Sequence, residues 1–158
     1  MKILFVCLGN ICRSPAADGV LLHRIQELAL EEQIQVDSAG TSAYHAGEGA
    51  DRRMQEHALK RGYKLPSISR GFTKRDFEEF DLIVAMDKSN YRNILKLDPE
   101  ENYKNKVKLF CSFCSGPYTS YEEVPDPYFG GARGFEEVMD LVENGVEGIL
   151  SQYGNKER

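Results

Sequence analysis

Cys7 and Arg13 enclose five residues in the segment FVCLGNICRSP (5–15), and Ser14 and Pro15 follow directly. A loop of this length that leads into a helix can turn its backbone N–H groups inward and bind an anion. The guanidinium of Arg13 is a planar fork that suits two oxygens of a phosphate group. Because the nucleotide-binding pattern GxxxxGK[ST] is absent, the loop predicts phosphate binding without ATP or GTP.

The thiol of Cys7 lies at the base of this predicted loop. Gly9 permits the unusual backbone angles that a tight turn needs, and Asn10 tolerates a left-handed conformation. A helix N-terminus and the nearby Arg13 favour the thiolate form of a cysteine, which is the nucleophile. We therefore expect Cys7 to attack phosphorus and form a cysteinyl-phosphate, with Ser14 donating a hydrogen bond to the sulfur when it leaves.

The departing oxygen needs a proton, and Asp126 is the candidate donor. It lies in the segment EVPDPYFGG (123–131), between two prolines that stiffen the loop. The same carboxyl would then deprotonate the attacking water in a second step. Because Arg13 and the loop amides hold the charge of the transition state, we expect no metal and no cofactor. No partner motif accompanies any of the three histidines, His23, His45 and His57.

Apolar runs that read as buried strands alternate with helical patterns along the chain. The predicted strands are 2–7, 34–39, 80–86 and 106–111, and the predicted helices are 14–30, 51–61, 88–97 and 135–153. This alternation predicts an α/β fold with a four-stranded parallel sheet and helices on both faces. With the flavodoxin-like order 2-1-3-4, the ligand-binding switch point falls at the end of strand 2–7. Ser14 is the predicted N-cap of the first helix, with Pro15 at its first position.

Length and composition limit the classes of protein that fit. The 158 residues predict one domain, 1–158, and a net charge of −5 argues against a nucleic-acid partner. No apolar run approaches the roughly 20 residues of a membrane span, and no signal peptide is recognised. We therefore expect a cytoplasmic protein whose four cysteines are thiols, and a monomer or weakly self-associating chain.

The sequence resembles the low-molecular-weight protein tyrosine phosphatases over essentially its full length. The similarity rests on four segments in order: VCLGNICRSP, DSAGT, MDKSN and DPYFGG. The resemblance implies that Cys7 is the nucleophile, Arg13 the phosphate clamp and Asp126 the general acid, and that the substrates are tyrosine-phosphorylated proteins. It also implies a network that holds the loop, formed by Asn10, Ser14 and Ser38.

Apolar and aromatic residues near the loop predict the substrate class. Tyr44 and Tyr128 are the expected walls of a cleft for an aromatic ring. The related protein arginine phosphatases carry threonine where this sequence has Ile11, so the resemblance favours phosphotyrosine. The residues predicted to contact the substrate are Leu8, Gly9, Asn10, Ile11, Cys12, Ser14, Tyr44 and Tyr128.

Three residues near the site have more than one interpretation. Cys12 either packs against the first strand or forms a disulfide with oxidised Cys7, and the resemblance favours this redox switch. Asp87, in MDKSN, either supports the loop network or caps the helix that follows. Ser67 stands at about the position where family members commonly carry a histidine, so a histidine-dependent part of the network differs here.

Two alternative functions also fit the loop, and the sequence holds one further pair of cysteines. A thiol-dependent arsenate reductase uses the same loop with a relay of cysteines, and a non-catalytic module would bind phosphate alone. The pair Cys111 and Cys114 forms a CxxC, but no second ligand pair for zinc accompanies it. We expect these two cysteines to pack in the core at a strand end.

Overall fold

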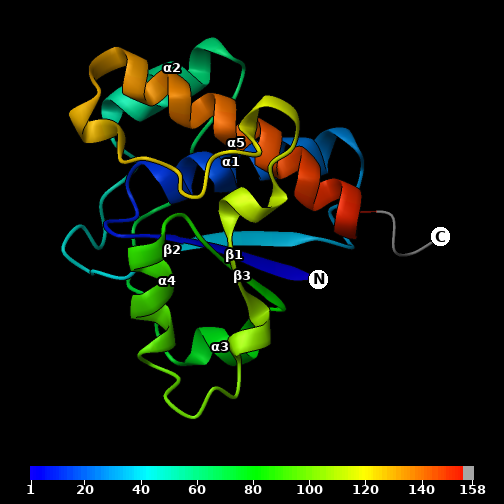
Figure 1. Cartoon of the computed structure of the whole chain (residues 1–158). Helices are drawn as coiled ribbons and strands as arrows, with labels where there is room; N and C mark the ends of the chain where they lie inside the picture. The colour runs from blue at the N-terminus through cyan, green and yellow to red at the C-terminus, as the bar shows by residue number, and fades with distance from the viewer. Residues whose placement is uncertain (155–158) are drawn as a thin grey trace.

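The computed structural model describes residues 1–154 and has a four-stranded parallel sheet at its centre (Figure 1). The strand order is β2-β1-β3-β4, which confirms the predicted order and α/β class. The last four residues of the predicted domain, 155–158, lie outside the described part. The strands are β1 (Lys2–Cys7), β2 (Gln35–Gly40), β3 (Leu82–Ala85) and β4 (Val107–Leu109).

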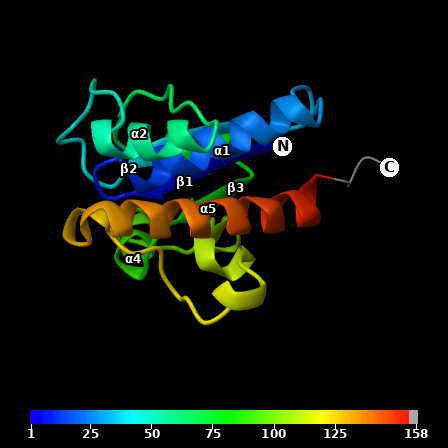
Figure 2. The same cartoon turned by 90° about the horizontal axis from the view of Figure 1, so that it is seen from above.

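Helices cover both faces of the sheet, as the alternating pattern predicts (Figure 1). Helices α1, α2 and α5 lie on one face, where α5 runs alongside α1 (Figure 2), and α3 and α4 lie on the other. The helices are α1 (Arg13–Glu27), α2 (Arg52–Lys60), α3 (Arg75–Glu79), α4 (Lys88–Leu95) and α5 (Gly131–Tyr153). Four short 3₁₀ turns complete the fold: η1 (Lys104–Lys106), η2 (Phe110–Phe113), η3 (Gly116–Tyr118) and η4 (Pro127–Phe129).

Strand β1 is apolar after Lys2 because both faces of the strand are buried there. Ile3 and Phe5 pack into the core shared with α1, α2 and α5. Leu4 and Val6 pack into the second core, shared with α3 and α4. Cys7 closes this strand at its carboxyl end, so two hydrophobic layers fix where the thiol lies.

The start of α1 differs from the prediction. The helix begins at Arg13, and no side chain caps it. Ser14, predicted as the N-cap, lies inside the first turn, where its hydroxyl contacts Cys7 and Asn10. Pro15 is the third helical residue, still within the turn whose N–H groups have no intrahelical acceptor. The Ser14 side chain therefore interacts with the cysteine segment and does not cap the helix.

Several predicted boundaries are also corrected. Helix α1 ends at Glu27, and Leu28 is 46% exposed, so this leucine is not part of the buried face. Strand β3 is shorter than 80–86, and β4 keeps three residues before the chain turns into η2. The short helix α3 is missing from the prediction. Helix α2 ends at Lys60, and Gly62, with a φ of +90°, follows its C-cap Arg61.

Helix α5 forms much of the core on its side of the sheet. Apolar residues at helical spacing within the predicted helix 135–153 are buried, namely Phe135, Val138, Met139, Val142, Val146, Ile149 and Leu150, whereas Tyr153 is only partly buried. Gly145 lies on the same face. A Cβ at this position would come within 2.3 Å of the Phe110 ring, so the close packing requires glycine. The helix starts at Gly131, four residues before the predicted start, and it directly follows the segment that holds Asp126.

Candidate active site

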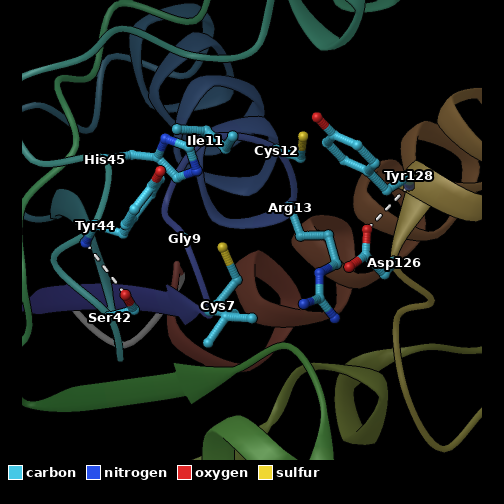
Figure 3. Close-up of a pocket in the computed structure, with 11 residues that line it drawn as sticks. Cys7, Gly9, Ile11, Cys12, Arg13, Ser42, Tyr44, His45, Asp126 and Tyr128 are labelled. Carbon is cyan, nitrogen blue, oxygen red and sulfur yellow. Dashed lines mark hydrogen bonds between the residues drawn. The ribbon is translucent and has the colours of Figure 1, made fainter.

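The segment between β1 and α1, residues 8–12 and here called the cysteine loop, forms the floor of a cavity of about 300 Å³ (Figure 3). It lies at the carboxyl end of the central strand, where the strand order reverses, as the topology predicts. The lining residues come from three parts of the chain: Cys7, Leu8, Gly9, Ile11, Cys12, Arg13, Ser42, Tyr44, His45, Asp126 and Tyr128.

Two hydrogen-bonding groups face the sulfur of Cys7. The backbone N–H of Asn10 donates to Cys7 Sγ at 3.2 Å, and Ser14 Oγ lies 3.0 Å from the same atom. Because Asn10 Nδ2 donates to Ser14 Oγ at 2.8 Å, the serine accepts from the amide and its own hydroxyl hydrogen is free to point at the sulfur. Both groups can therefore present a hydrogen-bond donor to the sulfur.

Asn10 holds the shape of the cysteine loop. Its φ is +56°, a left-handed conformation that asparagine tolerates. Its side-chain oxygen accepts a hydrogen bond from the backbone N–H of Arg70 at 3.0 Å, while Ser69 Oγ donates to the Gly9 carbonyl at 3.1 Å. The segment 69–70 thus braces the loop from outside, a contribution that sequence analysis missed.

The backbone amides of the cysteine loop are available to an anion. In the described part of the chain, the N–H groups of Leu8, Gly9, Ile11 and Cys12 donate to no protein acceptor. The carbonyls, in contrast, are tied down: Leu8 O accepts from Ser42 N at 2.9 Å and Ile11 O from Asp51 N at 2.7 Å. A loop with fixed carbonyls and unpaired N–H groups has the character of an anion-binding nest.

Arg13 is buried, with 5% of its surface exposed, and its guanidinium is held from outside the loop. Nη1 donates to Asp87 Oδ2 at 2.7 Å and to the Val124 carbonyl at 3.0 Å. Burial alone would lower the pKa of Arg13, but the neighbouring Cys7 and Asp87 raise it on balance. The guanidinium is therefore a fixed positive charge beside the sulfur.

Asp87 combines the two roles that the sequence leaves open. Besides its ion pair with Arg13, its side chain accepts from the backbone N–H of Asn90 at 2.7 Å. The Asn90 side chain in turn accepts from the Asp87 N–H, which completes a capping box at the start of α4. The same carboxylate thus fixes both a helix and the phosphate clamp.

Asp126 and the two tyrosines surround the opening above Cys7 (Figure 3). Asp126 stands before η4, and its Oδ1 accepts from the backbone N–H of Tyr128 at 3.0 Å. Tyr44 and Tyr128 lie on opposite sides of the cavity. The structure thus brings together the thiol, the guanidinium, the carboxyl and both predicted aromatic walls.

A family model described as low molecular weight phosphotyrosine protein phosphatase matches residues 2–158. The chain belongs to this family. A putative low molecular weight protein-tyrosine-phosphatase of Synechocystis is 51% identical over 156 residues, which cover 99% of this chain and 98% of that protein. A crystal structure of a protein tyrosine phosphatase from Entamoeba histolytica, with Hepes in its active site, aligns with a TM-score of 0.92 at 46% identity, covering 100% of this chain and 99% of that one.

The same fold is found in a phosphatase named for another amino acid. A crystal structure described as drosophila arginine phosphatase aligns with a TM-score of 0.89 at 31% identity and covers 99% of both chains. The fold therefore does not by itself select the phosphorylated residue, and the side chains around the cavity must do so.

Within this low molecular weight phosphatase, Cys12 is a buried thiol that lines the cavity. It is 7% exposed, and burial, together with the charges of Asp51 and Cys7, raises the pKa of this thiol to about 12. Cys12 therefore stays protonated at neutral pH, and neither Cys12 nor Cys7 forms a disulfide in the structure.

Ser38 does not make the contacts of the predicted loop network. Ser38 is buried in β2, but its hydroxyl makes no hydrogen bond of good geometry to Asn10 or Ser14 and instead faces the Asp18 carboxyl. The Ser67 hydroxyl is likewise buried without a partner in the described residues. Direct support of the loop comes from segment 69–70 instead.

His45 and Ser42 line the cavity although sequence analysis did not select them. The His45 ring packs edge-on against Tyr44, with centroids 4.9 Å apart, and its Nδ1 lies 2.9 Å from Glu48 Oε2. Ser42 Oγ accepts from the Tyr44 N–H at 3.2 Å. Their closeness to Tyr44 in the chain was the available signal.

The CxxC pair lies outside the cavity. Cys111 is buried in η2, as predicted, whereas Cys114 is only partly buried against the same core. A hydrogen bond between the two thiols raises the pKa of Cys111 and lowers the pKa of Cys114. In residues 1–154, no group of three potential metal ligands is found, and no helix is long and apolar enough to cross a membrane.

Proposed function

We propose that this protein hydrolyses phosphotyrosine in proteins through a cysteinyl-phosphate on Cys7. The observation that carries the proposal is the placement of Cys7 Sγ beneath a cavity, between two hydrogen-bond donors, with Arg13 and Asp126 beside it. A nucleophile, a fixed cation and a carboxyl at one opening are the groups that phosphoryl transfer through a thiol needs.

In the first step, the thiolate of Cys7 attacks phosphorus. The S–P bond forms while the bond from phosphorus to the tyrosine oxygen breaks, and Asp126 gives its proton to that oxygen. Arg13 and the unpaired N–H groups of the cysteine loop hold the remaining phosphate oxygens in the transition state. The leaving tyrosine departs with its hydroxyl restored.

In the second step, the ionised Asp126 takes a proton from a water molecule, whose oxygen attacks phosphorus. The S–P bond breaks, and inorganic phosphate forms. The sulfur leaves as a thiolate, which the Ser14 hydroxyl and the Asn10 N–H stabilise from 3.0 and 3.2 Å. Every charge in the two steps is met by a residue of this chain, so the proposal includes neither a metal nor a cofactor.

The walls of the cavity support an aromatic substrate. Tyr44 and Tyr128 flank the opening, and Ile11 adds an apolar surface between the loop and the walls. A phenyl ring packs well on such surfaces, whereas a guanidinium would meet no acceptor on Ile11. Tyrosine-phosphorylated proteins in the cytoplasm are therefore the proposed substrates, with a monomer or weakly self-associating chain as the active form.

Cys12 is proposed to protect the nucleophile from oxidation. A peroxide would convert the Cys7 thiolate to a sulfenic acid, with the peroxide reduced to water or an alcohol. The Cys12 sulfur would then attack that sulfur, releasing water and forming a disulfide that thiols reverse.

Hydrolysis of p-nitrophenyl phosphate in EDTA, with wild type and Cys7→Ser compared side by side, tests the proposed function. We expect turnover by the wild type that survives EDTA and vanishes in the variant, while the variant still binds phosphate. An inert, freshly reduced wild type would favour the phosphate-binding module, or the arsenate reductase if thiol-dependent arsenate reduction were found. Activity in Cys7→Ser would exclude the cysteinyl-phosphate.

A further inference from the structure

We propose that Arg53 is a positioning residue that holds Tyr128 as a wall of the cavity and thereby sets the affinity for aryl substrates. The inference rests on the proposed phosphatase function. It starts from Tyr128, which is 59% exposed and belongs to the short turn η4. A side chain this exposed needs a partner to keep one position beside the cavity.

Arg53 supplies that partner from helix α2. Its Cζ lies 4.8 Å from the centroid of the Tyr128 ring and 5.0 Å from the centroid of the Phe135 ring. Both distances are within the range of a cation–π contact. The guanidinium thus bridges an exposed tyrosine and a phenylalanine that is 1% exposed.

The Phe135 side of this bridge is fixed by the core. Phe135 belongs to the buried face of α5, and its ring stacks on His57 of α2 at 5.4 Å with an interplanar angle of 9°. Because the Phe135 ring is held in this way, it stays in place even if the Arg53 guanidinium moves. Arg53 therefore transfers the rigidity of α2 and α5 to Tyr128.

Asp51 holds the guanidinium from its other side. Its Oδ2 lies 3.3 Å from Arg53 Nη2, while its Oδ1 accepts the backbone N–H groups of Arg53 and Met54 as the N-cap of α2. The backbone N–H of Asp51 donates to the Ile11 carbonyl. The start of α2 is thus hydrogen-bonded to the cysteine loop, and Arg53 connects it to Tyr128 on the other side of the cavity.

The last link leads to the proposed general acid. Tyr128 donates its backbone N–H to Asp126 Oδ1 at 3.0 Å. A continuous set of contacts therefore runs from Ile11 through Asp51, Arg53 and Tyr128 to Asp126. Arg53 itself does not line the cavity, and the contact that it makes with a lining residue's ring is the one with Tyr128.

The experiment compares two ligands that differ in the presence of a ring. For Arg53→Ala, we expect the KM for p-nitrophenyl phosphate to rise about two- to fivefold, the factor that an exposed cation–π contact represents. The inhibition constant of inorganic phosphate, which has no ring to meet Tyr128, should stay within experimental error. Arg53→Lys keeps the charge but not the planar face, so its KM should lie between those of Ala and wild type.

Arg52→Ala is the matched control. This neighbour carries the same charge on the same helical turn, but its side chain is 92% exposed and pairs with Glu56. We expect its KM to equal that of wild type. In a Tyr128→Ala background, Arg53→Ala should have no further effect on KM, because the ring through which it acts is gone.

Three results would overturn the inference: an equal rise in KM for Arg52→Ala, an equal rise in the phosphate inhibition constant for Arg53→Ala, or additive effects in the Tyr128→Ala background. All are measured relative to the wild-type enzyme. Failure of the proposed function itself would be seen separately, as an inactive wild type or an active Cys7→Ser.

Discussion

Arg13 Nη1 lies 2.7 Å from Asp87 Oδ2, and this contact joins the first turn of α1 to the N-cap of α4 across 74 residues of chain. The pair holds a buried guanidinium close enough to Cys7 for the two groups to interact electrostatically. Because a buried cation with one missing partner is costly, the interaction matters for the site as well as for the fold.

Asp87→Asn should separate these two contributions. Asparagine is as good an N-cap as aspartate, so the cap of α4 is kept, and any fall in the melting temperature comes from the lost ion pair with Arg13. Loss of the charged hydrogen bond should weaken inorganic phosphate binding by about tenfold or more. Calorimetric titration with phosphate measures the affinity, and Asp87→Ala, which loses the cap as well as the ion pair, should be less stable than Asp87→Asn. Unchanged phosphate affinity in Asp87→Asn would contradict the positioning of Arg13 by this carboxylate.

Ser14→Ala should slow the release of the sulfur in the second step. Removing a hydrogen bond to a charged sulfur is expected to lower the rate of this step by about 10- to 100-fold. Rapid-mixing measurements with p-nitrophenyl phosphate should then show a burst of nitrophenol close to one equivalent, followed by slow turnover. Ser112→Ala, which removes a hydroxyl bonded to the Leu109 carbonyl far from the cavity, should keep wild-type kinetics. A variant without a burst and with normal turnover would exclude this role.

Asp126→Ala should lose most activity on substrates with poor leaving groups. General acid catalysis contributes about 10²–10⁴-fold, and phenyl phosphate needs the proton more than p-nitrophenyl phosphate does. The measurement is kcat/KM over a series of aryl phosphates of different phenol acidity. Glu122→Gln, which alters an exposed carboxylate of the same segment paired with Lys88, should leave the series unchanged. An equal loss for all leaving groups would argue against Asp126 as the acid.

Asp18→Asn should stabilise the protein at alkaline pH. Burial raises the pKa of the Asp18 carboxyl from 3.8 to about 7, so the folded state binds more protons than the unfolded state between those values. The free energy of unfolding of the wild type therefore falls as pH rises from about 4 to about 7, and the loss persists above that range.

An asparagine stays neutral, so the variant should gain on the order of 2–4 kcal/mol over the wild type at pH 8 and nothing at pH 4. Urea unfolding at both pH values measures the difference, with the exposed Glu32→Gln as the control. A gain of the same size at pH 4 and pH 8 would exclude ionisation of Asp18 as the cause.

The chemistry of the cysteine loop could be predicted because it is local in sequence. Cys7, Arg13 and Ser14 lie within eight residues, and a strand followed by a helix leaves few ways to arrange them. Asp126 could be proposed from its two flanking prolines, although only the fold brings it to the same opening as Cys7.

The supports of the loop could not be predicted in this way. Arg70 meets Asn10, and Val124 meets Arg13, through backbone atoms that carry no residue signature. Arg53 reaches Tyr128 only because α2 and η4 meet at α5. Helix α3 has five residues, too few to show a helical period, and the apolar residues after β4 pack as the turn η2 instead of extending the strand.

The most direct test of the account is to quench the enzyme during turnover of p-nitrophenyl phosphate and locate any phosphoryl group by mass spectrometry of its peptides. Ser14→Ala, in which the second step is expected to be slow, should accumulate the intermediate. We predict one phosphoryl group on the peptide that contains Cys7. This group should disappear when the substrate is allowed to run out before quenching. A phosphoryl group on another residue, or turnover through no phosphorylated enzyme at all, would contradict the cysteinyl-phosphate mechanism.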